Sequence, residues 1–191
     1  MYLEAMIRIG SATPKALLGL LSIHPMSGYD VRQLIPWSIG HFWNESYGQI
    51  YPALKQLTAS GLVAKKAERR KGRPERNVYS LTASGKKELR HWLGLAPVEE
   101  VPRVELLLKV FFGGHAAKGV TRKHVAAFLA AQESALQVYA ATEKQLKQEE
   151  SADPQLPYWL MTLNFGRHRS KALVRWAKET LAELERLERA G

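Results

Sequence analysis

The chain has 191 residues, of which 46% are hydrophobic, and it carries a formal net charge of +10. This composition argues against a disordered chain and predicts one or two domains with a real core. Because there are no cysteines, a disulfide scaffold, thiolate metal sites and cysteine nucleophiles are excluded. The first ten residues lack the apolar core of a signal peptide and no run of about 18 apolar residues occurs, so we expect a cytoplasmic protein without a membrane span.

Three helices are predicted in the first sixty residues. The first begins at Thr13, an N-cap residue followed by proline. Ser27 is positioned to cap the second helix. The third begins at Ser46, whose spacing to Gln49 is that of a capping box, and it ends at Gly61, a residue suited to the position after a helix.

The hydrophobic period changes after the third helix. Residues 62–68 and 76–82 have the pattern of two short strands, and Thr82 is positioned to cap a fourth helix. The order helix–helix–helix–strand–strand–helix is that of a winged helix-turn-helix. In that fold the third helix enters the DNA major groove and the β-hairpin, called the wing, contacts the neighbouring backbone.

The second half of the chain predicts an all-α domain. Residues 103–114 are apolar almost all round and are expected to be buried. Long helices are expected at about 121–149 and 158–189, each with a heptad seam, and two polar residues interrupt the first seam. We therefore predict a mainly α fold with a small β-hairpin: a winged helix-turn-helix DNA-binding domain at 1–93, a linker at 94–102 and a helical dimerisation domain at 103–191, which also has room for an effector.

A homodimer is predicted from the two long amphipathic helices, because one small domain cannot easily bury both seams. The alternative is a helical hairpin within one chain. The residues expected at the dimer interface are Leu129, Leu136, Tyr139, Leu173, Trp176 and Leu184.

Positive charge is concentrated between residues 65 and 76, where seven basic side chains accompany two acidic ones. This excess favours a polyanionic partner, although a solvated loop is the alternative. On the third helix, the apolar positions 50, 54 and 57 must face the core, which leaves Gln49, Tyr51 and Lys55 as outward donors for DNA. The basic residues of the wing that are expected to contact phosphates are Arg69, Arg70, Lys71, Arg73 and Arg76.

Pro52 falls within the predicted third helix. A proline in a helix interior typically costs about 3 kcal/mol, because it removes a backbone donor. It lies on the outward face with Gly48 and Lys55, so a kink that aims the start of the helix into the groove would explain it. The alternative is a structural quirk without a role in binding.

Three segments resemble the PadR family of bacterial transcriptional regulators: "LLGLLSIHPMSGYDVRQL", "FWNESYGQIYPALKQLTASGLV" and "NVYSLTASGKKEL". The distinctive part is the YG-x-IYPALK-x-L core at the recognition helix. "ELLLKVFFGG" and "WLMTLNFGRHRSKALVRW" are similar to the family's C-terminal helical region. The resemblance extends over residues 15–187.

The resemblance implies a homodimer that binds inverted-repeat operator DNA, most often as a repressor. It also implies release by a small-molecule effector in several members, of which phenolic acids are one class. It adds Ser46 and Tyr47 to the expected DNA contacts. Tyr47 and Tyr51 have an equally acceptable structural interpretation, because a tyrosine beside a helix often packs its ring and hydrogen-bonds its hydroxyl.

Other functions have less support. The sequence shows no Gly-rich phosphate loop, nucleophile elbow or metalloprotease motif, so an enzyme is not expected. The histidines do not have metal-ligand spacing, and neither a cofactor nor a metal is predicted. The tryptophans could stack on a small aromatic effector but are more often core residues, so no effector-binding residue is identified. A winged-helix adaptor for protein or RNA, without effector response, is the remaining alternative.

Overall fold

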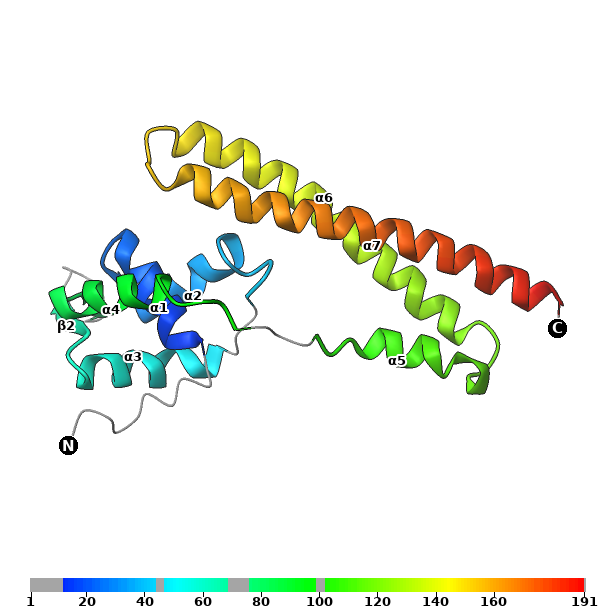
Figure 1. Ribbon diagram of the computed structural model, residues 1–191, viewed down its shortest axis with the longest axis horizontal. Coiled ribbons are helices and arrows are strands. Elements are labelled where there is room, and N and C mark those ends of the chain that lie inside the picture. The colour runs from blue at the N-terminus through cyan, green and yellow to red at the C-terminus, as the bar shows by residue number, and fades with distance from the viewer. Residues whose placement is uncertain (1–11, 44–46, 69–75, 99–101, 191) are drawn as a thin grey trace. The chain divides into compact units, whose positions relative to one another are not determined.

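The computed structural model describes residues 12–43, 47–68, 76–98 and 102–190. The chain divides into two compact units, residues 1–98 and 99–191, and each is described by itself. Figure 1 shows the elements in chain order. The first unit contains α1 (Thr13–Ile23), β1 (Met26–Ser27), α2 (Gly28–Leu34), η1 (Ile35–Trp37), η2 (Tyr47–Gln49), α3 (Ile50–Ala59), β2 (Val63–Glu68), β3 (Arg76–Leu81) and α4 (Ala83–Leu93). The second contains α5 (Glu105–Phe111), η3 (Gly113–His115), α6 (Val120–Glu149) and α7 (Leu156–Ala190).

The core of the first unit lies between α1, α2, α3 and the small sheet. The apolar face predicted for the third helix is confirmed, because Ile50, Leu54 and Leu57 are each no more than 3% exposed. Leu17 of α1 and Val63 of β2 complete the centre of this core. Full burial of each such side chain contributes about 1.5–3 kcal/mol, and together they hold α3 with its other face outward.

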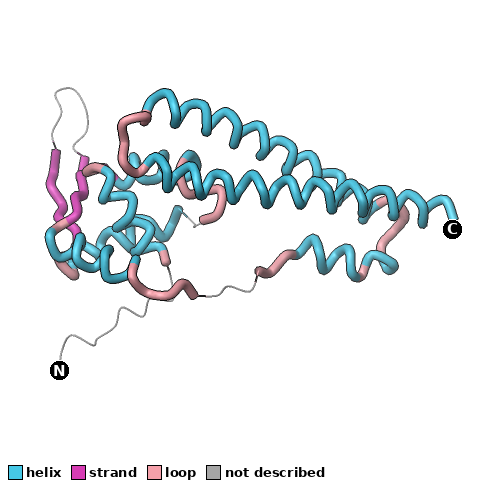
Figure 2. Tube along the Cα trace, turned by 45° about the horizontal axis from the view of Figure 1, so that its top comes forward, coloured by secondary structure: helices cyan, strands magenta, loops and turns pink. Residues whose placement is uncertain are grey.

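The sheet has three antiparallel strands in the order β1-β3-β2, drawn in magenta in Figure 2. The two predicted strands are confirmed and pair from Val63↔Leu81 to Glu68↔Arg76. Strand β1 was not predicted, and it pairs with β3 through Ser27↔Val78. A two-residue strand is too short to show the alternation on which strand prediction depends.

Local chemistry at the helix ends follows most of the predictions. The hydroxyl of Ser27 accepts a hydrogen bond from the amide of Asp30 (3.2 Å), whose carboxylate accepts one from the amide of Ser27 (2.9 Å). Thr82 caps α4 by accepting from the amide of Gly85 at 3.0 Å. Gly61 adopts a left-handed backbone with φ 71° after α3. The predicted cap at Thr13 was wrong, because this residue is buried within the first turn of α1 and Ala12 occupies the cap position.

The start of the third helix differs from the prediction. A 3-10 turn, η2, comes first, and α3 begins only at Ile50 with Gln49 as its cap residue. Ser46 lies outside the described residues, and Gln49 makes no side-chain cap hydrogen bond. Pro52 is therefore the third residue of α3, where backbone N–H groups have no partner within the helix. The expected cost of an interior proline does not arise.

The second unit is dominated by α6 and α7, which run antiparallel and lie side by side in Figures 1 and 2. The long helices predicted from the heptad pattern are confirmed, and Val125 and Ala177 in their seams are completely buried. The hydroxyl of Ser170 donates to the side-chain oxygen of Gln132 at 2.9 Å. Hydrogen bonding of this kind lets a polar residue occupy a seam position without an unsatisfied group.

The side chains predicted for a dimer interface lie in or beside the seam between α6 and α7 of one chain. All six are half-buried: Leu129, Leu136, Tyr139, Leu173, Trp176 and Leu184. Trp176 meets Phe128 edge to face, with ring centroids 5.8 Å apart. The intramolecular helical hairpin is thus present, and the homodimer stays a prediction.

The prediction that residues 103–114 are buried was wrong. Helix α5 contains no buried residue, and Phe111 is 80% exposed. Leu107, Leu108 and Phe112 are also exposed. Within its unit, helix α5 packs chiefly on α6, which covers only one of its sides. A helix that is apolar all round is buried only when other elements cover its remaining sides as well.

Candidate nucleic-acid interface

The outward face of α3 carries small side chains and hydrogen-bond donors, and the opposite face of the helix is buried in the core. Gln49, Tyr51, Pro52 and Lys55 are exposed, as are Gly48, Gln56 and Ala59. Their positions follow from the burial of the opposite face, because residues three and four apart share one side of a helix. The amide, phenol and ammonium donors expected on the outward face are therefore exposed.

Tyr51 has an exposed side and a packed side. It is 56% exposed, yet its ring lies so close to Gly28 that a Cβ there would be 2.6 Å from a ring carbon. Gly28 is the first residue of α2, so the tyrosine holds the start of α3 against the start of α2. The pKa of Tyr79, a buried neighbour on β3, is raised by burial and to a lesser extent by Tyr51. Both roles considered for Tyr51 are compatible with this position.

The wing is described only at its stem. Lys65 and Lys66 of β2 are exposed, and β2 is an edge strand of the sheet. The predicted phosphate contacts Arg69, Arg70, Lys71 and Arg73 lie outside the described residues. Tyr47 begins η2, but its side chain is also outside the described part of the chain.

Arg76, the last predicted wing contact, is held by two carboxylates. Its Nε donates to Glu68 Oε2 at 2.7 Å across the β2–β3 pair. Its Nη1 lies 3.3 Å from Oδ2 of Asp30, the residue whose carboxylate closes the capping box of α2. The functional interest of Asp30 was not predicted, although the Ser27-x-x-Asp30 spacing of a capping box is visible in the sequence.

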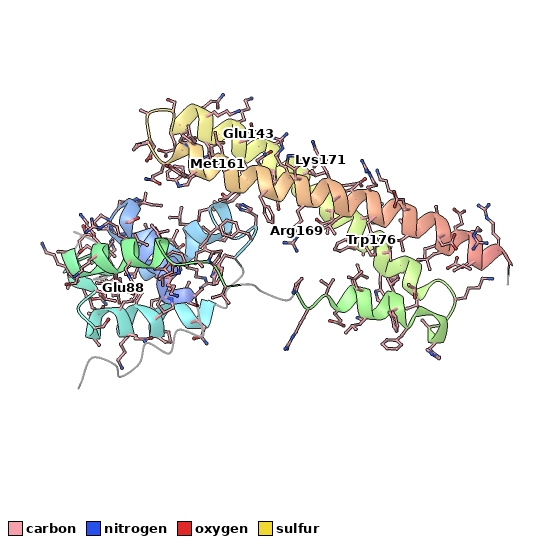
Figure 3. All side chains as sticks on the ribbon, viewed as in Figure 1. Glu88, Glu143, Met161, Arg169, Lys171 and Trp176 are labelled. Carbon is pink, nitrogen blue, oxygen red and sulfur yellow. The ribbon has the colours of Figure 1, made fainter. Side chains whose placement is uncertain are left out.

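The helical unit offers polar groups at the seam and none in a metal-binding arrangement. Figure 3 labels Glu143 on α6, which pairs with Lys147 at 2.7 Å and Arg167 at 2.6 Å. Within the described ranges, no group of three or more His, Asp or Glu residues could hold a metal ion. Nor does any helix in the described part of the chain have the length and hydropathy to cross a membrane.

Two protein families match this architecture along the chain. Residues 17–91, which cover most of the winged unit, match the family described as "Transcriptional regulator PadR-like family". Residues 102–185, which contain α5, α6 and most of α7, match "Virulence activator alpha C-term". The winged unit belongs to the PadR-like family of transcriptional regulators. PadR-like proteins are DNA-binding regulators rather than enzymes, and the predicted mainly helical winged fold is confirmed.

One relative has been crystallised with DNA and with a small ligand. "Negative transcriptional regulator PadR" of Bacillus subtilis is 39% identical over 98 residues, which span 51% of this chain and 54% of that protein. The structure of Bacillus subtilis PadR in complex with operator DNA is 29% identical with a TM-score of 0.75, over 91% of this chain and 99% of that one. Its complex with p-coumaric acid gives 29% identity and a TM-score of 0.69, over 92% and 99%.

A second similar structure has a different described role. The Vibrio cholerae virulence activator AphA is 26% identical with a TM-score of 0.71, over 92% of this chain and 99% of that one. Proteins similar to this chain are therefore described both as a negative regulator and as an activator. The direction of regulation has to be argued separately from the fold.

Proposed function

We propose that this protein is a homodimeric repressor that binds an inverted-repeat operator through α3 and the wing. The observation that carries the proposal is the exposed outer face of α3, with Gln49, Tyr51 and Lys55 above the buried Ile50 and Leu54. Lysine and tyrosine suit phosphates or base edges, and glutamine can pair with adenine. The wing basics Arg69, Arg70, Lys71 and Arg73, with Ser46 and Tyr47 before α3, complete the proposed contact set.

Repression is favoured over activation by the relative with the higher identity. Over nearly the whole chain, Bacillus subtilis PadR is 29% identical and the activator 26% identical, and over 98 residues the negative regulator is 39% identical. A dimer bound across a promoter also occludes it. We place the DNA-binding domain at 1–93, the linker at 94–102 and the helical domain at 103–191, in a protein that works in the cytoplasm, where bacterial DNA is found.

The exposed apolar residues of the helical unit support the dimer. Phe111 and Leu108 of α5 are exposed, as are Met161 and Phe165 on α7. They form two separate exposed sets, one on α5 and one near the start of α7, and exposed apolar patches mark interaction surfaces. A twofold partner covers such faces, and it also places two recognition helices about one DNA turn apart, as a palindromic site requires.

A small aromatic effector is part of the proposal. A relative has been crystallised with p-coumaric acid, and the helical unit of this chain contains Trp159 and Trp176. Aromatic rings of this kind can stack on a planar ligand. The winged-helix adaptor without effector response is the alternative that an effector titration distinguishes.

The test is a mobility shift with the promoter of the protein's own gene, at two salt concentrations and against random DNA. We expect a specific complex that weakens steeply with salt, because lysine and arginine release counterions from phosphates. Lys55→Ala combined with Arg73→Ala should abolish the shift while the dimer persists. Equal affinity for random DNA at both salt concentrations would refute operator recognition.

A further inference from the structure

The start of α2 (residues 27–30, hereafter the α2 start) contacts both elements that are proposed to meet DNA. Tyr51 of α3 packs its ring on Gly28, so closely that a Cβ on the glycine would lie 2.6 Å from a ring carbon and the ring would have to shift. On the wing side, β1 pairs with β3 through Ser27↔Val78. Asp30 then reaches the first residue of β3 through its contact with Arg76. Recognition helix and wing are therefore both attached to one four-residue segment.

Asp30 Oδ2 serves two donors at once. It accepts a hydrogen bond from the amide of Ser27 at 2.9 Å, which closes the capping box of α2. It also lies 3.3 Å from Arg76 Nη1. A shift of the wing stem relative to α2 would have to break or lengthen one of these contacts. The carboxylate thus connects the backbone at the α2 start to the wing.

The guanidinium of Arg76 is shared between two carboxylates. Nε faces Glu68 and Nη1 faces Asp30, a division that uses the planar fork of arginine and that a lysine ammonium cannot reproduce. The three side chains are 34–40% exposed. A phosphate approaching Arg76 would therefore have to compete with both carboxylates instead of meeting a free cation.

Lys66 provides the contrast on the wing stem. It pairs in register with Val78, two residues from Arg76, and it is exposed. It forms no ion pair within the described residues. A lysine in this position can serve a phosphate without giving up another partner.

We propose that Arg76 and Asp30 form a positioning pair, which fixes the wing relative to the recognition helix through the α2 start, rather than Arg76 being a phosphate ligand. The proposal rests on the operator binding proposed above. It makes Arg76 a determinant of specificity, because phosphate contacts support any sequence whereas the relative placement of wing and helix matters for one register on DNA. The two roles predict opposite changes in operator affinity for one substitution.

The decisive variant is Asp30→Asn, which keeps a cap acceptor for Ser27 and removes the charge that holds Arg76. If Arg76 bound phosphate, losing a nearby acid would free it and tighten binding to any DNA. For a positioning pair, affinity for the operator falls about tenfold or more while affinity for a scrambled duplex holds or rises. Arg76→Lys should reproduce this loss, although it keeps the charge, because lysine lacks the rigid fork that directs Nε to Glu68 and Nη1 to Asp30.

The measurement is fluorescence anisotropy of the full chain with operator and scrambled duplexes, over a series of salt concentrations. For Arg76→Gln we expect a lower operator preference with an unchanged salt slope. A slope that falls by about one unit, with the preference intact, identifies a phosphate ligand and overturns the proposal. Lys66→Gln is the matched control, and it should lower the affinities for the operator and for the scrambled duplex by the same factor.

A second readout does not depend on DNA. Amide hydrogen exchange should be faster in Asp30→Asn across the wing stem, at residues 66–68 and 76–78, and not in Lys66→Gln. Unchanged exchange in Asp30→Asn would overturn the positioning role. A wild-type protein that prefers no operator, yet shows this exchange difference, would refute the proposed function while leaving the positioning pair intact. If Asp30→Asn lowered the melting temperature but kept the full preference for the operator, the pair would have only a structural role and the proposal would be overturned.

Discussion

At the scale of single residues, Gly85 marks a very close approach between two backbones. A Cβ on this residue would lie 2.1 Å from the carbonyl oxygen of Leu62. That oxygen already accepts hydrogen bonds from the amide and hydroxyl of Thr82, at 3.1 and 3.0 Å. Because the cap of α4 depends on the same contacts, the backbone cannot move aside without loss.

We expect Gly85→Ala to lower the free energy of unfolding of the winged unit by about 3 kcal/mol, the cost of overpacking with backbone displacement. Gly19→Ala is the control, because a Cβ there has no neighbour within 4 Å and alanine favours the α1 helix by about 1 kcal/mol. Urea unfolding followed by circular dichroism measures both. Similar effects of the two variants would contradict the packing argument.

Residue-level prediction succeeded where chemistry is local. Ser27, Thr82 and Gly61 were assigned correctly because a cap involves residues within one turn of each other. Arg76 and Asp30 are 46 positions apart in the sequence, and no local pattern indicates that they meet. The ion pair at the wing stem therefore needed the fold.

At the scale of elements, the two-part start of α3 removes the difficulty that Pro52 posed. The proline stands in the first turn, which lacks intrahelical partners for its donors in any case. Sequence spacing predicted one continuous helix from Ser46, because a 3-10 turn and the first turn of an α-helix have similar periodicity over three residues. The sequence pattern could not show where the backbone hydrogen bonds change from the 3-10 type to the α-helical type.

Pro52→Ala is expected to change the free energy of unfolding by less than about 1 kcal/mol, since lost rigidity of the unfolded chain and gained helix propensity act in opposite directions. Gln56→Pro, one turn further along the exposed face, should cost about 3 kcal/mol or more. Thermal or urea unfolding compares the two variants. A large loss from Pro52→Ala would show that this residue shapes the helix after all, and full operator affinity in that variant would remove any role in binding.

The helical hairpin contains a carboxylate whose titration affects stability. The hydrogen bond from Lys147, with the charges of Lys147 and Arg167, holds the pKa of Glu143 below its ordinary value against partial desolvation. A group with a lowered folded pKa stabilises the fold above its unfolded pKa, about 4.3 for glutamate, and this stabilisation is lost as the pH falls through the folded value.

We therefore expect Glu143→Gln to be less stable than the wild type at pH 7, with a difference that shrinks as the pH is lowered from about 5 to about 3. Unfolding of the full chain at several pH values measures it. Glu179→Gln is the control for loss of one acid, because Glu179 is an exposed residue of α7 without an ion pair among the described residues. A difference that grows on acidification would contradict a lowered pKa for Glu143 in the folded protein.

At the scale of the whole molecule, packing within a single chain does not explain why the apolar side chains of α5 are exposed. The sequence predicted burial from its apolar character, and the structure leaves its largest side chains exposed. Periodicity reports how much apolar surface a helix carries, but it does not report whether the same chain or a second copy covers that surface. The observed exposure of α5 is consistent with the proposed dimer, in which a second copy would cover it.

Phe111→Ser should convert the dimer to a monomer, or shift its dissociation constant by about tenfold or more, because exposed aromatics at interfaces are frequent hot spots. Val98→Ser is the matched control: its side chain is 87% exposed, compared with 80% for Phe111, and it lies in the other unit. Size-exclusion chromatography with light scattering measures the mass. A wild-type monomer at all concentrations would refute the dimer.

The hydrogen bond between Gln132 and Ser170 disfavours other registers of α6 against α7. Two long helices with apolar seams can slide by one heptad and still bury similar side chains. A slip of seven residues would place Gln132 opposite Leu163 or Ala177, where its amide would have no partner in a buried seam. Arg167 would lose Glu143 in the same movement. These two contacts add little strength, but they make one register distinguishable from its neighbours, and they would do so equally if helices were exchanged between two copies of the chain.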